Sequence, residues 1–265
     1  MRRSRQIQIE SAKILVSENG FAWTVLFVLR LVTRYRLPVF DRLMRRLERA
    51  KSLPGTTSVS GSRAVWESYE WDKLGEEWTE SADWKASLID DVLVPNLPRD
   101  GVILEIGPGA GRWTEVLQAL AREVVIVDFS STCIEACRQR FAGYPNITYH
   151  VNDGATLTAV ADSSVDGVWS FDVFVHLDAA TTESYISEIR RVLRPGAKAL
   201  IHSGKGGGTF GGWRSRMTSA QMREIVDRQD LEWVAEIDSW GPRGEHGLQY
   251  VDAIYVFEKR PPSAD

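Results

Sequence analysis

A strand that runs directly into three closely spaced glycines most constrains what this 265-residue chain can fold into. The segment Val102 to Thr114 reads VILEIGPGAGRWT, an apolar run followed by Gly107-x-Gly109-x-Gly111 and then by an amphipathic stretch. Glycines permit a tight turn and let a ligand approach the backbone closely. The free N–H groups at the start of the following helix favour an anion. The segment therefore predicts a strand, a ligand-binding turn and a helix in succession.

From residue 80 onward, short apolar runs alternate with helical patterns. The predicted strands are 102–106, 124–127, 147–151, 165–171, 197–202, 231–237 and 249–257. The predicted helices are 82–93, 112–122, 132–141, 181–193 and 219–228. Such alternation indicates parallel β-α-β units, while the last two strands, with no helix between them, indicate an antiparallel pair at the sheet edge. We expect an α/β fold with a doubly wound, mostly parallel, seven-stranded sheet, an antiparallel last strand and an N-terminal helical extension.

Charge divides the chain into two parts. Residues 1–54 hold 12 Lys/Arg and 4 Asp/Glu, a net charge of +8, whereas residues 55–265 carry −12. The acidic remainder argues against nucleic-acid binding, which requires a positive face. A stretch rich in Ser, Gly, Pro and Thr at 51–63 indicates a linker. We therefore expect a basic arm with its linker at 1–60 and a domain at 61–265, with a lid at 61–100 and a core at 101–265.

The basic arm contains apolar stretches whose partner the sequence leaves open. The run from Phe21 to Val32 is shorter than the ~20 residues that a bilayer-spanning helix needs. Further on, the apolar residues of 39–47 share one helical face and the arginines lie off it, as in a basic amphipathic helix. The arm could lie on an anionic membrane surface. Alternatively, its apolar face could pack on the domain or on a second copy of the chain.

Two details narrow the choice of ligand class for the glycine turn. The dinucleotide fingerprint G-x-G-x-x-G needs a third glycine at a position that this chain does not provide, because Arg112 follows Gly111. Instead, Glu105 lies two residues before the first glycine. Asp128 ends the next predicted strand, 21 residues after Gly107, where a carboxylate can accept hydrogen bonds from both hydroxyls of a ribose.

These residues resemble the class I S-adenosylmethionine-dependent methyltransferases over about residues 66–258. The first motif of that family matches Glu105, Gly107, Gly109 and Gly111, and its ribose-binding acid matches Asp128, with Phe129 beside it for the adenine face. Asp153 and Gly154 match the acidic position that meets the adenine amino group, and segments 170–177 and 191–201 match the family around the fourth and fifth strands. The resemblance implies S-adenosyl-L-methionine as the cofactor. It further implies that Glu105 suits the methionine ammonium, and that Phe171 and the lid aromatic Trp78 help to bind the cofactor.

Candidates for catalysis follow the fourth and fifth strands, whose ends face the cofactor in this fold. A hydroxyl acceptor needs a base to take its proton. His176 resembles the histidine that deprotonates a hydroxyl in small-molecule O-methyltransferases, although it could instead line the pocket or cap a helix. His202 is a second candidate for base or helper. Asp172 could orient a histidine or, with both histidines, hold a divalent metal, but no chelating pair is evident and we predict no metal site.

Aromatic residues before the first core strand predict a lid or a local core. Trp66, Trp71 and Trp78 could contact a ligand, since flat rings suit sugars, or could simply fill the interior. Beside the glycine-rich loop 205–212, Trp213 and Arg214 could close over the acceptor from the other side.

The leading hypothesis is an O-methyltransferase that acts on a hydroxyl of a small or glycan acceptor, with a saccharide favoured. The alternative within the same class is a methyltransferase for a lipid, a quinone or another secondary metabolite. A non-catalytic, membrane-associated scaffold is the hypothesis from a different class. Two cysteines four residues apart are too few for a disulfide framework, which favours a cytoplasmic location. We expect no nucleic-acid partner, and both membrane attachment and homo-oligomerisation through the arm remain open.

Overall fold

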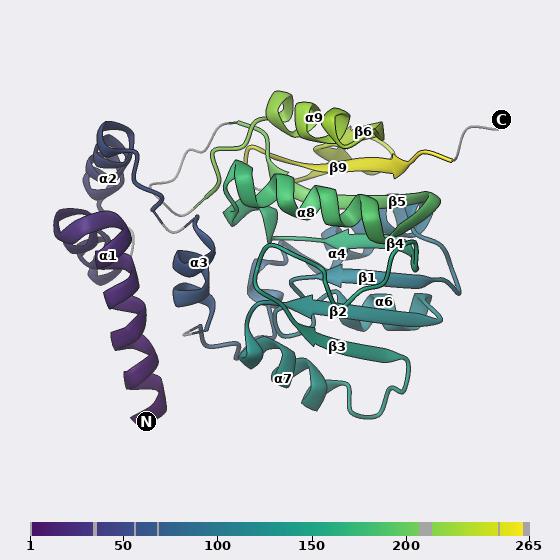
Figure 1. Ribbon diagram of the computed structural model, residues 1–265, viewed down its shortest axis with the longest axis horizontal. Helices are drawn as coiled ribbons and strands as arrows, with labels where there is room; N and C mark the ends of the chain where they lie inside the picture. The colour runs from purple at the N-terminus through teal and green to yellow at the C-terminus, as the bar shows by residue number, and fades with distance from the viewer. Residues whose placement is uncertain are drawn as a thin grey trace.

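A mixed seven-stranded sheet forms the centre of the molecule (Figure 1). The computed structural model describes residues 2–33, 36–55, 57–67, 69–206, 214–248 and 250–261. The strands of the sheet are, in spatial order, β3 (Ile147–Val151), β2 (Glu123–Asp128), β1 (Val102–Ile106), β4 (Val165–Ser170), β5 (Leu193–Gly204), β9 (Asp252–Lys259) and β6 (Leu231–Ile237). β9 runs antiparallel to both of its neighbours, β5 and β6, and the other neighbouring strands of this sheet are parallel. The expected doubly wound sheet with an antiparallel last strand is therefore confirmed.

Helices cover both faces of this sheet. On one face lie α8 (Ala179–Val192) and α9 (Ser219–Arg228), whose apolar residues share a core with one side of β1 and β2 (Figure 1). The helices α4 (Ala82–Leu88), α6 (Thr114–Leu120) and α7 (Ser131–Arg140) pack against the other face. All five residues of β1 are buried because a parallel strand covered on both sides has no solvent-facing positions.

Some element boundaries differ from those that the sequence predicts. Beyond α4 the helix continues as a π-helical turn, Ile89–Leu93, and a short α5, Val94–Asn96. The fifth strand begins at Leu193 and includes Pro195 and Gly196, where its register to β4 shifts, so this Pro-Gly pair forms an irregularity inside the strand. A two-stranded ribbon, β7 (Ser239–Trp240) and β8 (His246–Gly247), precedes β9. Most of the predicted glycine-rich loop, together with Trp213, lies outside the described residues.

The strand order creates a crevice next to β1. The chain proceeds outward from β1 through β2 to β3, and then returns to add β4 and β5 on the other side of β1. At such a switch point the connections after β1 and β4 leave in opposite directions, and a cleft opens beyond their carboxyl ends. The glycine turn follows β1, and a 3₁₀ turn, η3 (Phe174–His176), follows β4, so both candidate regions lie at this crevice.

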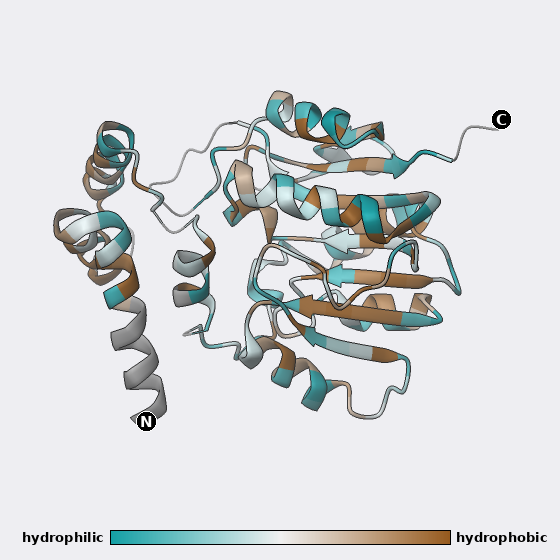
Figure 2. Cartoon of the chain, viewed as in Figure 1, coloured by the Kyte–Doolittle hydropathy of each residue, from teal (hydrophilic) through white to brown (hydrophobic). Residues whose placement is uncertain are grey.

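The N-terminal arm forms a helical hairpin beside the carboxyl ends of the parallel strands (Figure 1). It consists of α1 (Arg2–Val32), which is interrupted at Gly20 by a non-helical backbone, and α2 (Pro38–Lys51). Trp23, Phe27 and Met44 form a small core of their own between the two helices. Hydrophobic residues occur along both helices (Figure 2), and some of them, such as Phe21 and Val39, are exposed. A third helix, α3 (Val59–Trp66), lies between the hairpin and the sheet, and the expected boundary near residue 60 falls within it.

Candidate functional site

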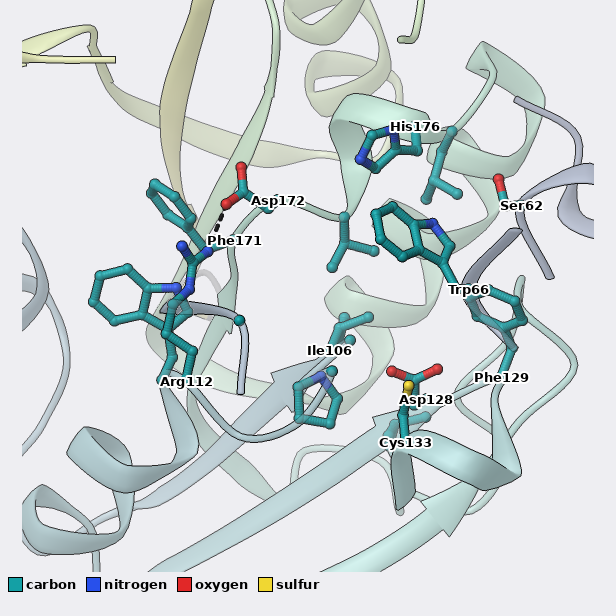
Figure 3. A pocket seen from close by; sticks show the side chains of 18 of the residues that line it. Ser62, Trp66, Ile106, Arg112, Asp128, Phe129, Cys133, Phe171, Asp172 and His176 are labelled. Atoms are coloured by element: carbon teal, nitrogen blue, oxygen red, sulfur yellow. Dashed lines mark hydrogen bonds and ion pairs between the residues drawn. The ribbon is translucent and has the colours of Figure 1, made fainter. Parts of the chain in front are cut away.

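A largely apolar pocket lies at the carboxyl ends of β1, β2 and β4 (Figure 3). We call it the first pocket. Its lining residues come from α3, the segment 71–78, the glycine turn, the end of β2 and the segment after β4; they include Ser62, Trp66, Trp71, Trp78, Gly107, Gly109, Arg112, Asp128, Phe129, Phe171, Asp172, His176 and Tyr185. Most of the residues that the sequence assigns to cofactor binding or catalysis are thus brought together here.

The glycine turn shapes the floor of the first pocket. Gly107 and Gly109 have φ angles of 71° and 56°, which side-chain-bearing residues rarely adopt. A Cβ at Gly107 would lie 2.3 Å from Cγ2 of Val173, and one at Gly109 would lie 2.7 Å from the ring of Trp71. Gly111 has a φ angle of 90° but faces the ring of Phe141 and does not line the pocket. The first two glycines therefore let Val173 and Trp71 pack directly on the turn at the pocket, and the third permits helix packing.

Asp128 presents a buried carboxylate to the pocket from the end of β2 (Figure 3). Its Oδ1 accepts a hydrogen bond of 2.8 Å from the backbone N–H of Ser130. Burial raises the pKa of this carboxyl to about 7, although hydrogen bonds from backbone N–H groups act in the opposite direction. Phe129 follows it in the wall, with the guanidinium of Arg63 5.5 Å from its ring centroid.

Glu105 lies beneath the pocket and does not line it. Its Oε2 accepts a hydrogen bond of 2.6 Å from the hydroxyl of Thr114, in the first turn of α6. Burial raises the pKa of the Glu105 carboxyl to about 7. This contact ties β1 to α6 across the glycine turn, so Glu105 has a structural role even without a ligand.

Asp153 and Gly154 stand apart from the first pocket. The exposed Asp153 turns back on its own loop, where Oδ1 accepts hydrogen bonds from the N–H groups of Ala155 and Thr156. Gly154 is buried against Val59 of α3 and the side chain of Phe129. Contact of Asp153 with an adenine amino group stays a prediction from the family resemblance.

Arg112, which the sequence analysis did not assign to binding, reaches into the first pocket (Figure 3). The side chain is buried, and its Nη2 contacts Oδ2 of Asp172 at 2.5 Å. Its Nη1 atom is buried without a hydrogen-bond partner among the described residues. Because a buried guanidinium N–H is costly to leave unpaired, this atom indicates a site for an anion. In the sequence, the only sign of this role was the position of the arginine directly after the third glycine.

Four aromatic residues before α4 form a compact cluster over the first pocket. Trp66, Tyr69, Trp71 and Trp78 contact one another with ring centroids 5.0 to 6.0 Å apart. Among them Trp66, Trp71 and Trp78 line the pocket. The expected packing and ligand-contacting roles are therefore compatible, because the same rings fill a local core and present a face to the pocket.

A second, more polar pocket adjoins the first. Its lining residues are Trp66, Trp78, Trp84, Phe171, Asp172, His176, His202, Arg214, Leu248, Tyr250 and Asp252. Trp66, Trp78, Phe171, Asp172 and His176 line both pockets. These shared residues separate the two spaces, so a group bound in one lies next to a group bound in the other.

His176 occupies this shared wall. It ends the 3₁₀ turn η3, is buried, and has its ring centroid 5.2 Å from that of Trp66 (Figure 3). Asp172, for which the sequence left open a role in orienting a histidine or in holding a metal, joins Arg112 to His202. Asp172 therefore orients His202, the second of the two candidate histidines.

His202 lies between two carboxylates and is poorly suited to act as a base. Its Nδ1 is 3.1 Å from Oδ1 of Asp172 and its Nε2 is 3.4 Å from Oδ2 of Asp252. Although burial lowers the pKa of this imidazole, the two carboxylates outweigh that effect and raise it. The pKa of Asp172 is lowered because His202 and Arg112 together outweigh the opposing effect of burial. The raised pKa favours the protonated form of His202, which cannot accept a proton, so these contacts suit a positioning role better than the base role, which stays a prediction.

Arg214 completes a buried chain of alternating charges. Its guanidinium forms an ion pair with Asp252 and lies 4.3 Å from the ring centroid of Tyr250. The chain runs Arg112, Asp172, His202, Asp252, Arg214 and connects the two pockets. Among the described residues there is no group of three or more His, Cys, Asp or Glu side chains that could hold a metal.

Comparisons with known proteins agree with this geometry. Residues 103–196 match a family model described as a methyltransferase domain. The chain is 33% identical over 100 residues to phosphoethanolamine N-methyltransferase 1 of Caenorhabditis elegans, covering 38% of this chain and 20% of that protein. It is 35% identical over 100 residues to a probable S-adenosylmethionine-dependent methyltransferase of Mycolicibacterium smegmatis, covering 37% and 36%. The chain thus spans well under half the length of these relatives.

Solved structures share the fold at low sequence identity. A SAM-dependent methyltransferase of Leishmania major superposes with a TM-score of 0.63 at 12% identity, covering 81% of this chain and 91% of the other. A TehB-like SAM-dependent methyltransferase of Corynebacterium glutamicum has a TM-score of 0.55 at 23% identity, covering 74% and 99%.

The residues of the first pocket fit the cofactor of this family. The glycine turn in the lining, the buried Asp128 carboxylate and the unpaired Nη1 of Arg112 match a ligand with a flat base, a ribose and a carboxylate. The sheet topology, the site and the matched segment 103–196 lead to one conclusion. This chain has the class I methyltransferase fold, and its residues 103–196 match a methyltransferase domain.

Proposed function

We propose that this protein transfers a methyl group from S-adenosylmethionine to a hydroxyl group of a small or glycan acceptor, with His176 as the general base. The observation that carries the proposal is the position of His176 in the wall shared by the two pockets. A base must lie within reach of both the acceptor hydroxyl and the place where the methyl group is presented. His176 is the one histidine that lines both described pockets.

The first pocket holds the cofactor in this proposal. When bound, S-adenosylmethionine supplies a methyl group that its sulfonium already activates for displacement. Asp128 accepts hydrogen bonds from the ribose hydroxyls, Phe129 packs on the adenine, and Arg112 binds the methionine carboxylate. Trp71 and Trp78 cover the cofactor and exclude water from it.

The second pocket orients the acceptor. His176 accepts the hydroxyl proton, while the ion pairs of Asp172 keep His202 and Arg112 fixed on either side of the shared wall. Correct alignment of the two reactants supplies much of the rate acceleration in a displacement of this kind. Because the five charged groups are paired with one another, they provide a rigid polar surface.

A saccharide suits the second pocket because flat indole rings and charged hydrogen-bonding groups lie side by side there. Trp66, Trp78 and Trp84 offer faces for a sugar ring, and Asp252 and Arg214 offer polar atoms for its hydroxyls. A lipid, quinone or other secondary metabolite is the alternative acceptor with the same chemistry. The similarity to phosphoethanolamine N-methyltransferase 1 raises a third candidate, an amine.

Product analysis identifies the acceptor class. The purified full chain is incubated with S-adenosylmethionine carrying a labelled methyl group, together with glycan and lipid fractions of a cell extract or with phosphoethanolamine. We expect label in an alkali-stable methyl ether of the glycan fraction. Label in the lipid fraction would select the alternative acceptor, and label on phosphoethanolamine nitrogen would contradict hydroxyl methylation.

Replacement of His176 tests the base. With the acceptor so identified, we expect His176→Ala to lower kcat by about 100-fold or more, in line with general-base catalysis. The affinity for S-adenosylhomocysteine should change little, and added imidazole should restore part of the turnover. His246→Ala is the matched control, since His246 lies in β8 outside both pockets. Normal turnover of His176→Ala with an unchanged pH profile would refute the assignment.

A further inference from the structure

The helical hairpin of the arm exposes an apolar stripe on the side away from its own core. Phe21, Val25, Val28, Leu29 and Val32 are spaced so that they share one face of α1, and their exposed fractions are 76%, 38%, 49%, 40% and 73%. The opposite face of the same helix buries Trp23 and Phe27 against Met44 of α2. The helix is therefore apolar on two sides, of which internal packing uses only one.

The second helix of the hairpin combines exposed apolar and basic residues. Val39 and Leu43 are 47% and 41% exposed and are one helical turn apart. Arg42, Arg46 and Arg49 are also exposed and lie beside them on the solvent face of α2. The buried side of α2 instead contains Met44 and Glu48. An apolar strip with a row of arginines next to it thus faces outward.

We propose that this surface, formed by the exposed residues of α1 and α2, docks on an anionic lipid surface. Apolar side chains would enter the boundary between headgroups and acyl chains, while the arginines would bind the phosphates of the headgroups. Charge complementarity decides in favour of lipid over a second copy of the chain. A two-fold dimer would bring the same surface of each copy together and place like charges opposite one another.

The docked helices lie on the membrane and do not cross it. By length and composition alone, Ala12–Val32 could cross a membrane. However, Gly20 interrupts the helix with φ 77° and ψ 164°. The part beyond it, Phe21 to Val32, would extend only about 18 Å at 1.5 Å per residue, against a hydrocarbon core of about 30 Å. Crossing would also withdraw Trp23 from its hydrogen bond to Glu48.

Hydrogen bonds and an ion pair connect the proposed docking surface, the exposed face of α1 and α2, to the elements that line the first pocket. Glu18 of α1 accepts a hydrogen bond of 2.7 Å from the hydroxyl of Ser58, which caps α3. The helix α3 in turn places Ser62 and Trp66 in the pocket wall. On the other side, Arg216 contacts Glu48 of α2 at 3.1 Å. The arm is therefore held to the domain at both helices, and docking would keep the pocket next to the lipid surface.

Vesicle flotation of the full chain tests the proposal. We expect the protein to float with phosphatidylcholine vesicles containing 30% phosphatidylglycerol, to float poorly with phosphatidylcholine alone, and to be released by high salt. The variant Arg42→Glu/Arg46→Glu/Arg49→Glu should bind at least ten-fold more weakly. Its matched control is Arg138→Glu/Arg190→Glu/Arg228→Glu, which changes the net charge equally at exposed positions of the domain.

A second variant separates lipid docking from self-association. Phe21→Ser/Val32→Ser replaces the two most exposed residues of the stripe and should preserve folding, because both side chains face solvent. We expect it to lose flotation while light scattering reports a monomer for it and for the parent chain. Three results would overturn the proposal: no flotation of the parent chain, equal flotation of the arginine variant, or a parent dimer that this variant dissociates.

Discussion

The two adjoining pockets are built in different ways, although they share a wall. The first is assembled mostly from the ends of the neighbouring strands β2, β1 and β4 and the turns directly after them, within residues 106–133 and 171–177. The second draws Trp84, His202, Arg214 and Tyr250 from four separate segments. Its polarity comes from His202, Asp252 and Arg214 of the buried charge chain together with Asp172, whereas the first pocket combines the glycine turn with Asp128 and the single ion pair of Arg112 with Asp172.

This difference shows how one fold can keep a cofactor and change acceptors. Strand ends and glycine turns are fixed by the sheet, so a cofactor that uses them can be kept while other segments vary. The acceptor side depends on side chains that meet only after the whole chain has folded. Substitutions at different residues of the two pockets should therefore change the stability, the cofactor affinity and the acceptor affinity independently of one another.

The largest effect is expected in stability, from breaking the buried charge chain at Asp252. In Asp252→Asn, the buried Arg214 and His202 lose their common carboxylate, which should lower the free energy of unfolding by about 3 kcal/mol. Chemical denaturation measures this change. Affinity for S-adenosylhomocysteine in the folded protein should stay within about three-fold, because Asp252 lines only the second pocket.

Asp230→Asn serves as the control for that prediction. Asp230 is 71% exposed and contacts Arg190 and Arg260 at 3.9 and 3.4 Å on the surface, so its loss should cost less than about 1 kcal/mol. Equal destabilisation by both substitutions would show that the buried chain has no special energetic role.

Cofactor affinity should respond most strongly to Asp128. Asp128→Ala removes the carboxylate that we propose to accept two charge-assisted hydrogen bonds from the ribose, so it should weaken binding of S-adenosylhomocysteine by about 100-fold, as measured by calorimetry. Asp153→Ala is the informative partner, because Asp153 is exposed and bonded to its own loop. We expect less than a three-fold change there. A loss comparable to that of Asp128→Ala would show that the loop rearranges when the adenine binds.

The sequence predicts the residues of the first pocket better than those of the second, for physical reasons. The strand, the glycine spacing and Asp128 are local signals, since neighbouring residues decide where a buried strand ends and which turn the chain then makes. Arg112 was missed because its role appears only when Asp172, sixty residues later, is placed beside it. Likewise, no local pattern reveals that His202 lies between Asp172 and Asp252, so its charge state could not be inferred.

Stability should depend on pH through His202. Because the pKa of this imidazole is raised above its ordinary value of 6.5, its contribution is fully present below pH 6.5 and is lost as pH rises through the folded-state pKa. The difference in unfolding free energy between the parent chain and His202→Gln should therefore shrink above pH 6.5, by no more than about 1.4 kcal/mol per pH unit.

In the difference between the two proteins, the contributions of other buried groups that titrate in the same pH range cancel. Glu105 and Asp128, whose pKa values burial raises to about 7, are present in both proteins. A difference that grows above pH 6.5 would mean that His202 is neutral between its carboxylates and favour it as a base.

The smallest expected effects come from single aromatic substitutions, which distinguish binding in the first pocket from binding in the second. Phe129 lines only the first pocket, Tyr250 only the second, and Trp66 lines both. Since an aromatic contact contributes about 1 kcal/mol beyond its buried area, each substitution to leucine should change any affinity that it affects by about five-fold. Phe129→Leu should weaken S-adenosylhomocysteine binding alone, Tyr250→Leu should raise the acceptor KM alone, and Trp66→Leu should do both.

Calorimetry measures the affinity for S-adenosylhomocysteine, and initial rates with the identified acceptor measure its KM. If Tyr250→Leu weakened the cofactor as much as Phe129→Leu, the two pockets would form one binding unit, because a residue outside the first pocket would then control the ligand inside it.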